Sequence, residues 1–289
     1  MDSFKDKVVI VTGAGGGLGR AHALEFARRG AKVVVNDLGS SADGSGASDM
    51  ADQVVEDIRK AGGIAIANKA SVSDRVAAKS IVDDAVSEFG TVDILVNNAG
   101  ILRDKSFKNM SLDDWDLVMN VHLNGTAYVT HAAWPIMYEK NYGRILFTSS
   151  TSGIFGNFGQ ANYGAAKMGM LGLMNVLALE GAKNNVRVNT LAPAAATRMI
   201  STIPGRDIDP DSPPPESAPK LVSPAVLFMT SDEAPTGAVI NAGGGRYYRA
   251  QIFVNDPIDL GVEASFEDLM ANTESLMDMS QAKPKTGGV

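Results

Sequence analysis

Short runs of apolar and β-branched residues alternate with longer helical patterns along almost the whole chain. The runs lie at 8–11, 32–36, 64–67, 94–96, 144–148, 186–191 and 238–241. Helical periodicity occupies the stretches between them, near 18–29, 48–61, 74–89, 111–139, 161–183 and 219–230. This alternation is typical of βαβ units, in which helices cover both faces of a parallel sheet. The sequence therefore predicts an α/β fold with a doubly wound parallel sheet of seven strands.

The seven strands and their crossovers need most of the 289 residues, so the pattern predicts a single domain over 1–245. Proline recurs through 203–219 and excludes a regular helix there. The segment 197–220 is either a flexible linker or, as long loops in compact domains more often are, a substrate loop. We expect residues 246–289 to be a C-terminal extension of the same domain with a frayed end.

Bulk composition excludes several classes of protein. Hydrophobic residues make up 45% of the chain and charged residues 20%, as in ordinary globular enzymes. A net charge of −7 argues against nucleic acid as a partner, and no apolar run approaches the roughly 20 residues that span a bilayer. With no cysteine and a polar N-terminus, we expect a cytoplasmic protein without disulfides or bound metal.

A glycine-rich segment after the first run predicts a dinucleotide site. It reads Thr12-Gly13-Ala14-Gly15-Gly16-Gly17-Leu18-Gly19 and opens a helix. Backbone N–H groups of Gly13, Gly16, Gly17, Leu18 and Gly19 would approach a pyrophosphate at the helix N-terminus, as in Rossmann-like folds. The alternative is a flexible turn without a ligand.

An acidic residue at the end of the second run indicates which dinucleotide is bound. Asp37 follows Gly19 at about the spacing of roughly 20 residues expected for the residue that binds the adenosine ribose hydroxyls. Its carboxylate would repel the 2′-phosphate of NADP, and no lysine or arginine occupies 33–46. The sequence favours NAD, the alternative being a helix-capping aspartate.

Three further residues predict acid–base chemistry. Tyr163 and Lys167 are four residues apart and share one face of the helix over 161–183. A nearby ammonium favours the phenolate and is expected to lower the pKa of Tyr163. Ser150 follows the strand at 144–148, so its hydroxyl could bind the substrate oxygen beside the tyrosine.

Taken together, these motifs resemble the short-chain dehydrogenase/reductase family. The resemblance covers 7 to about 245 and includes Asn97-Asn98-Ala99-Gly100. It implies hydride transfer between nicotinamide and an alcohol or ketone, with Ser150, Tyr163 and Lys167 as catalytic residues. It also implies that the cofactor is bound by Ser71, Val72, Asn98, Ala99, Gly100, Pro193 and Thr197, in addition to Tyr163 and Lys167.

Within this family, the segments 33–39, 97–104 and 156–163 are similar to the (3R)-hydroxyacyl-CoA dehydrogenase units of type 2 peroxisomal multifunctional enzymes, which are also 17β-type hydroxysteroid dehydrogenases. The chain looks like a stand-alone, bacterial counterpart. The implied substrate is an acyl-CoA, with a steroid, or a 3-oxoacyl reductase activity, as alternatives. A non-catalytic NAD sensor is a remote alternative, because such proteins tend to lose the tyrosine or lysine.

The sequence departs from the family pattern at three positions. His122 occupies the usual asparagine position, so it is either a member of the catalytic set or a packed helix histidine. Thr197 arrives one residue early after Pro193, and Ser71 replaces an aspartate that often contacts adenine.

Residues near the strand ends suggest how a substrate would bind. Arg103 and Lys105 follow the fourth strand, and Arg198 and Arg206 follow the sixth. We expect Arg198 and Arg206 to meet CoA phosphates and Phe155, Ile200 and Ile203 to contact the acyl chain, the alternative being solvated surface arginines. The resemblance implies assembly through the helices 111–139 and 161–183, and the apolar surface of 161–183 supports the prediction of a homodimer or homotetramer.

Overall fold

The computed structural model describes residues 4–46, 48–196, 209 and 213–285. They fall into two compact units, Met1–Arg249 and Ala250–Val289. Several residues predicted in the substrate loop lie outside the described residues, namely Thr197, Arg198, Ile200, Ile203 and Arg206.

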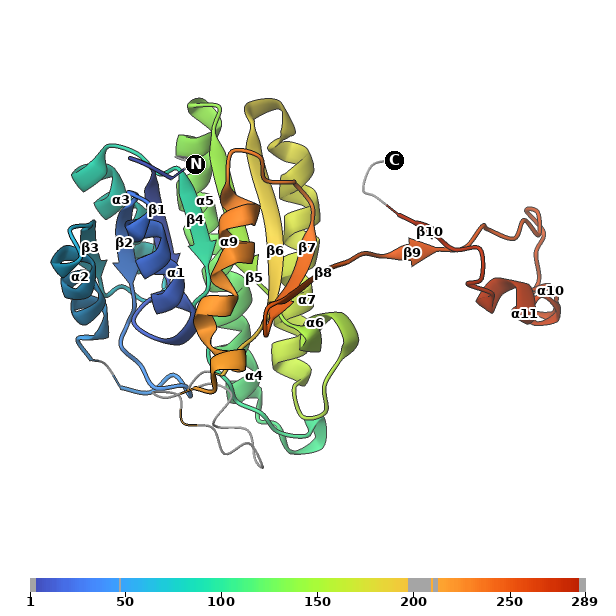
Figure 1. The fold of residues 1–289 in the computed structure, drawn as a ribbon. Coiled ribbons are helices and arrows are strands. Elements are labelled where there is room, and N and C mark those ends of the chain that lie inside the picture. The colour runs from blue at the N-terminus through green and yellow to red at the C-terminus, as the bar shows by residue number, and fades with distance from the viewer. Residues whose placement is uncertain (1–3, 47, 197–208, 210–212, 286–289) are drawn as a thin grey trace. The chain divides into compact units, whose positions relative to one another are not determined.

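The first unit is built on a central, mostly parallel sheet (Figure 1). The strands are β1 (Val8–Thr12), β2 (Lys32–Asn36), β3 (Ile64–Asn68), β4 (Ile94–Asn97), β5 (Gly143–Thr148), β6 (Val186–Ala194), β7 (Val239–Gly243) and β8 (Arg246–Ala250). Their order is β3-β2-β1-β4-β5-β6-β7-β8. All seven predicted strands are present and the doubly wound, Rossmann-like fold is confirmed, because the order reverses direction between β1 and β4.

The eighth strand was not predicted. Gly244 and Gly245 have φ angles of 56° and 73°, so they form a two-residue turn between β7 and β8. A connection this short joins only antiparallel neighbours. Strand β8 carries Tyr247 and Tyr248 in a largely exposed edge position, and therefore lacks the apolar run by which the buried strands are recognised.

Helices cover both faces of the sheet. One face carries α1 (Gly17–Arg28), α2 (Met50–Lys60) and α9 (Ser223–Thr230), whose apolar side chains share one core with the strands. The other helices are α3 (Arg75–Phe89), α4 (Leu112–Met119), α5 (Gly125–Glu139), α6 (Thr151–Phe155) and α7 (Ala161–Glu180). The helix predicted over 111–139 is divided by a π turn at Asn120–Asn124. Such turns hold one extra residue per turn and often mark functional sites.

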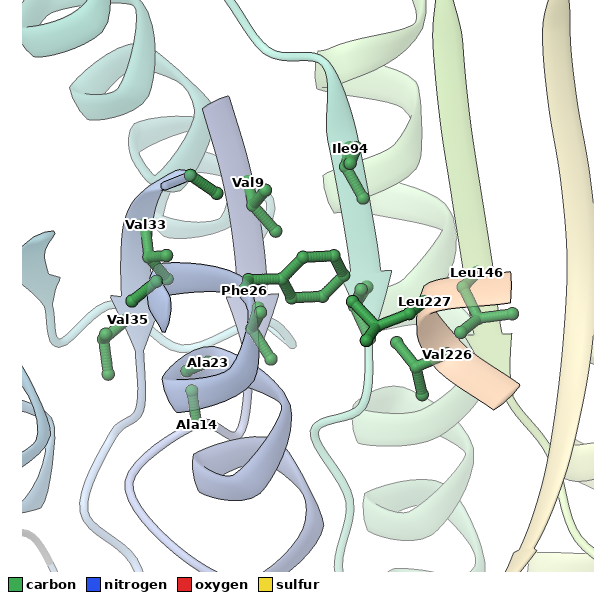
Figure 2. Packing of buried hydrophobic residues seen from close by; sticks show 14 of the residues in the cluster. Val9, Ala14, Ala23, Phe26, Val33, Val35, Ile94, Leu146, Val226 and Leu227 are labelled. Atoms are coloured by element: carbon green, nitrogen blue, oxygen red, sulfur yellow. The ribbon is translucent and has the colours of Figure 1, made fainter. Parts of the chain in front are cut away.

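The core beneath α1 and α9 consists of buried side chains from the strands and from the helices α1, α2 and α9. Figure 2 shows Phe26 of α1 among Val9, Ile94 and Leu227. The Phe26 ring is completely buried and meets Phe4 edge-on at a centroid distance of 5.4 Å. This packing holds α1, and with it the glycine-rich segment at its N-terminus, against the sheet.

The second unit contains β9 (Phe253–Val254), α10 (Phe266–Ala271), α11 (Thr273–Met277) and β10 (Lys283–Pro284), with β9 and β10 antiparallel. Ser265 and Asp268 form a capping box at the start of α10. The structure groups Ala250–Val289 as a unit of its own, and the assignment of 246–289 to the first domain stays a prediction. Among the described residues, no helix is long and apolar enough to cross a membrane.

Replacing Phe26 by alanine should destabilise the first unit by about 3–5 kcal/mol, because the change leaves a cavity under α1. Guanidinium unfolding followed by tryptophan fluorescence measures this directly, since Trp115 and Trp134 both lie in this unit. As a control, Phe228→Ala on α9, where the side chain is 53% exposed, should cost less than about 1 kcal/mol. Equal losses in the two variants would contradict this description of the core.

Candidate active site

A cleft of about 310 Å³ opens at the carboxyl ends of the parallel strands. Ligands of open α/β sheets bind in this place, beside the point where the strand order reverses. The cleft is lined by every predicted catalytic and cofactor residue that the structure describes: Gly13, Gly16, Gly17, Leu18, Gly19, Asp37, Ser71, Val72, Asn98, Ala99, Gly100, His122, Ser150, Tyr163, Lys167 and Pro193. A larger open groove of about 810 Å³ between α1 and α9 contains none of them.

The glycine-rich segment lies directly against the end of β4. A side chain at Gly13, whose φ is 64°, would come within 2.7 Å of Ala99 Cα, and one at Gly19 within 2.1 Å of the Gly13 carbonyl oxygen. Asn98 Nδ2 donates to the carbonyls of Thr12 (2.9 Å) and Gly13 (3.1 Å). Asn98 therefore fastens the loop and lines the cleft at the same time. Only glycine at positions 13 and 19 lets the segment lie this close to the end of β4.

Asp37 lies at the end of β2, next to the glycine-rich segment. Its Oδ2 accepts a hydrogen bond from Gly15 N and its Oδ1 one from Gly39 N, each at 2.7 Å. Two carboxylate oxygens offer about four acceptor positions, so the group can still bind two ribose hydroxyls. The residues around this end of the cleft thus fit an adenosine ribose without a 2′-phosphate.

Tyr163 and Lys167 project from α7 into the cleft and are both buried. Lys167 Nζ donates to the Thr148 carbonyl at 2.5 Å and lies 5.4 Å from the centroid of the Tyr163 ring. Burial lowers the pKa of Lys167 to about 7. Burial also raises the pKa of Tyr163 to about 12, against the hydrogen bond of the Ser150 hydroxyl, which lowers it.

The expected lowering of the Tyr163 pKa by Lys167 is not found in this structure. Desolvation of the phenolate is the dominant influence, and the charge of Asp104 adds to it. The ammonium of Lys167 is itself desolvated, so at neutral pH it carries only part of its charge. Tyr163 therefore keeps its proton at neutral pH.

His122 lies within the π turn and is completely buried. Its ring meets the Tyr163 ring edge-on at 5.1 Å, and its Nε2 lies 2.7 Å from the Ile101 carbonyl oxygen and 3.0 Å from Ile101 N. Burial, followed by the charge of Lys167, holds the pKa of His122 well below 6.5, so the ring is neutral. Its Nδ1 has no hydrogen-bond partner among the described residues. The histidine is therefore packed in the fold and also lies against the Tyr163 ring.

Other predicted residues lie elsewhere. Phe155 is 69% exposed at the end of α6 and does not line the cleft. Arg103 and Lys105 both face Asp114, at 3.7 Å and 3.4 Å, so their charges are partly neutralised within the fold.

Sequence reasoning missed a polar pair beside Tyr163. Gln160 Nε2 donates to Asp104 Oδ2 at 2.7 Å, and partial burial of this carboxyl raises its pKa. The charge of Asp104 in turn raises the pKa of Tyr163. Both residues stand in segments that carry the family resemblance, but a contact across 56 positions leaves no local signal.

Comparison with known proteins agrees with this geometry. Residues 7–204 match the short chain dehydrogenase family, to which the chain belongs. It is thus a short-chain dehydrogenase/reductase, an oxidoreductase, and its resemblance to the dehydrogenase unit of multifunctional enzymes is confirmed.

Three similar proteins illustrate the family relationship. A protein of Mycobacterium tuberculosis named as a short-chain type dehydrogenase/reductase is 49% identical over 285 residues, which are 98% of each chain. Peroxisomal multifunctional enzyme type 2 of the mouse is 52% identical over 244 residues, or 84% of this chain but only 32% of the mouse enzyme. A crystal structure of a short chain dehydrogenase from Mycobacterium avium superposes with a TM-score of 0.83 at 39% identity, covering 99% of this chain and 100% of the other.

The depressed pKa of Lys167 predicts a pH-dependent stability. The unfolded lysine holds its proton up to about pH 10.5, whereas the folded one releases it near 7, so unfolding takes up a proton between these values. Burying Lys167 is therefore most costly below about pH 7, and the cost disappears as the pH rises to 10.5. We expect the Lys167→Met protein, without cofactor, to gain stability over the wild type at low pH and to lose this advantage at high pH.

Guanidinium unfolding at about pH 6.5 and about pH 9.5 measures the difference. Lys60→Met serves as the control, because Lys60 is 73% exposed on α2 and should show no such pH dependence. An advantage of Lys167→Met that is the same at both pH values would contradict the low pKa.

Proposed function

We propose that this protein is an NAD-dependent oxidoreductase that interconverts a secondary alcohol and a ketone, with (3R)-3-hydroxyacyl-CoA and 3-oxoacyl-CoA as the substrate pair. The observation that carries the proposal is the meeting of Ser150, Tyr163 and Lys167 with Asp37 and the glycine-rich segment in one cleft. One end of the cleft fits a dinucleotide, and the other offers a proton donor beside a hydroxyl group.

Bound NAD would accept or supply the hydride, and the chain would supply binding and proton transfer. The glycine-rich segment would hold the pyrophosphate at the N-terminus of α1. Asp37 would bind the adenosine ribose and disfavour NADP, because Lys167 is the one lysine or arginine among the residues that line the cleft in the described part of the chain. Ser71 and Val72 would contact the adenine, and Asn98, Ala99, Gly100, Pro193 and Lys167 the remainder of the cofactor.

Tyr163 exchanges a proton with the substrate oxygen in this proposal. With a pKa raised to about 12, its phenol is a proton donor for ketone reduction. For alcohol oxidation the phenolate is required, and a positively charged nicotinamide beside the ring would lower the pKa of Tyr163. The Ser150 hydroxyl would hold the substrate oxygen, and His122 would support the ring of Tyr163 from its edge.

The choice of substrate rests on the likeness to the mouse multifunctional enzyme. A 17β-type hydroxysteroid is the alternative, since the apolar contacts of a steroid and of an acyl chain are alike. A biosynthetic 3-oxoacyl reductase would prefer NADPH, which Asp37 disfavours. A purely NAD-sensing module is disfavoured by the presence of Ser150, Tyr163 and Lys167 together.

We also propose that the chain acts as a homodimer or homotetramer. Helix α7 keeps Met168, Val176 and Leu179 between 43% and 57% exposed, although one face of the helix already packs in the core. A second copy would cover this apolar face.

Tyr163→Phe should lower kcat about 10²–10⁴-fold with a much smaller effect on NADH affinity, because it removes the proton donor and keeps the aromatic ring in the cleft. Steady-state kinetics with a (3R)-3-hydroxyacyl-CoA and with a 17β-hydroxysteroid measure the effect and compare the two substrate classes. The matched control is Tyr248→Phe, which lies 56% exposed on β8. A variant that keeps more than about a tenth of kcat would refute the role of Tyr163, and faster turnover of the steroid would overturn the choice of acyl-CoA.

Asp37→Ala should raise KM for NAD about tenfold or more and lower KM for NADP, since it removes two hydrogen bonds and a negative charge. The KM values for both cofactors are compared with those of Asp57→Ala, whose carboxylate pairs with Arg20 outside the cleft. An unchanged preference between NAD and NADP would show that Asp37 does not bind the ribose.

A further inference from the structure

The loop that follows β2, residues 38–46, forms one wall of the cleft. Leu38, Ser40, Ser41, Ala42 and Gly44 line the same cleft as the glycine-rich segment and Asp37. The connection from β2 to α2, which contains this wall, is far longer than the loops that usually follow a strand in α/β folds. The loop therefore needs contacts of its own to stay beside the cofactor site.

Those contacts come from the segment after β4. Leu102 N donates to the Ala42 carbonyl at 3.0 Å, and Arg103 Nε donates to the Asp43 carbonyl at 2.9 Å. A side chain at Gly44 would lie 3.3 Å from the Ile101 side chain, so the backbone of the loop packs directly on Ile101. Two segments that are 60 positions apart are thereby joined across the mouth of the cleft.

The loop is a preformed turn rather than an open strand. Ser41 N donates to the Ser45 carbonyl at 2.8 Å, and Asp43 Oδ1 accepts hydrogen bonds from Ser45 N and from the hydroxyls of Ser41 and Ser45. These bonds hold the pKa of Asp43 at about 2, so its carboxylate is ionised in all ordinary buffers. A turn with its own internal bonds can keep its shape when it is detached from the segment after β4.

The Arg103 side chain connects this turn to the part of the cleft that contains Tyr163. Besides the Asp43 carbonyl, its guanidinium faces Asp43 Oδ2 at 4.0 Å and Asp114 Oδ1 of α4 at 3.7 Å. The Arg103 carbonyl accepts from Asn162 Nδ2 at 3.3 Å, and Asn162 directly precedes Tyr163. With 34% of its side chain exposed, Arg103 acts at the rim and is absent from the residues that line the cleft.

We propose that Arg103 is a positioning residue that holds the 38–46 loop closed beside the adenosine end of the cleft and so sets the affinity and release rate of NAD(H). The inference rests on the proposed use of NAD. It assigns Arg103 to cofactor retention, because the guanidinium is already engaged within the fold by Asp43 and Asp114.

Arg103→Met removes the donors and keeps most of the side-chain volume. We expect NADH to dissociate about tenfold faster, because the variant loses one charge-assisted hydrogen bond. The KM for NAD should rise, and kcat should not fall. Stopped-flow displacement of NADH fluorescence gives the rate. Hydrogen exchange in the protein without cofactor gives a second readout, in which peptides covering 38–46 and 101–103 should exchange faster.

The matched control is Arg28→Met, because Arg28 pairs with Glu25 on α1 and does not line the cleft. A second variant replaces residues 41–45 by two glycines and so removes the carbonyls that Leu102 and Arg103 bind. Adding Arg103→Met to this shortened loop should produce no further acceleration, because the two changes break the same contact.

The proposal is overturned if Arg103→Met releases NADH at the rate of the wild type, or if its effect adds in full to that of the shortened loop. Failure of the NAD proposal is recognised separately, in the unmodified protein, by binding of NADPH in preference to NADH. In that case the same displacement experiment with NADPH decides the role of Arg103.

Discussion

The site depends on the close approach of two loops at the end of a parallel sheet. The glycine-rich segment after β1 packs against Ala99 so tightly that a single Cβ at Gly13 would collide with the backbone. Asn98 and Thr12 fix this contact, as the Thr12 hydroxyl accepts from Asn98 N and Ala99 N. Because β1 and β4 flank the point at which strand order reverses, the same contact defines the floor of the cleft. Core packing of α1 through Phe26 keeps it in place.

Burial of polar groups is the second constraint, and it links stability to chemistry. The fold buries Tyr163, Lys167 and His122 around one point, and desolvation drives each towards its neutral form. A buried tyrosine that keeps its proton can donate it, whereas accepting a proton requires the phenolate, which burial disfavours.

The seven strands could be predicted from the sequence because buried parallel strands are apolar throughout. The cleft residues could be predicted because the spacings of the glycines and of Tyr163 and Lys167 are local. Strand β8 was missed since its tyrosines are exposed. The π turn at Asn120–Asn124 was missed because it follows the helical pattern on both sides. The Asp104–Gln160 pair and the attachment of Arg103 to the 38–46 loop were beyond sequence reasoning, since both join distant segments. The predicted lowering of the Tyr163 pKa failed in this structure because a spacing of four residues does not reveal how far a phenol is desolvated.

Transfer of a deuterium label tests the central claim most directly. The protein is incubated with a 3-oxoacyl-CoA and NADH that carries deuterium at both positions of nicotinamide C4, and the product is examined by mass spectrometry. We expect a (3R)-3-hydroxyacyl-CoA labelled at C3, with the label absent when Tyr163→Phe protein is used for the same time. An unlabelled product, or no product while NADH is bound, would contradict hydride transfer in this cleft.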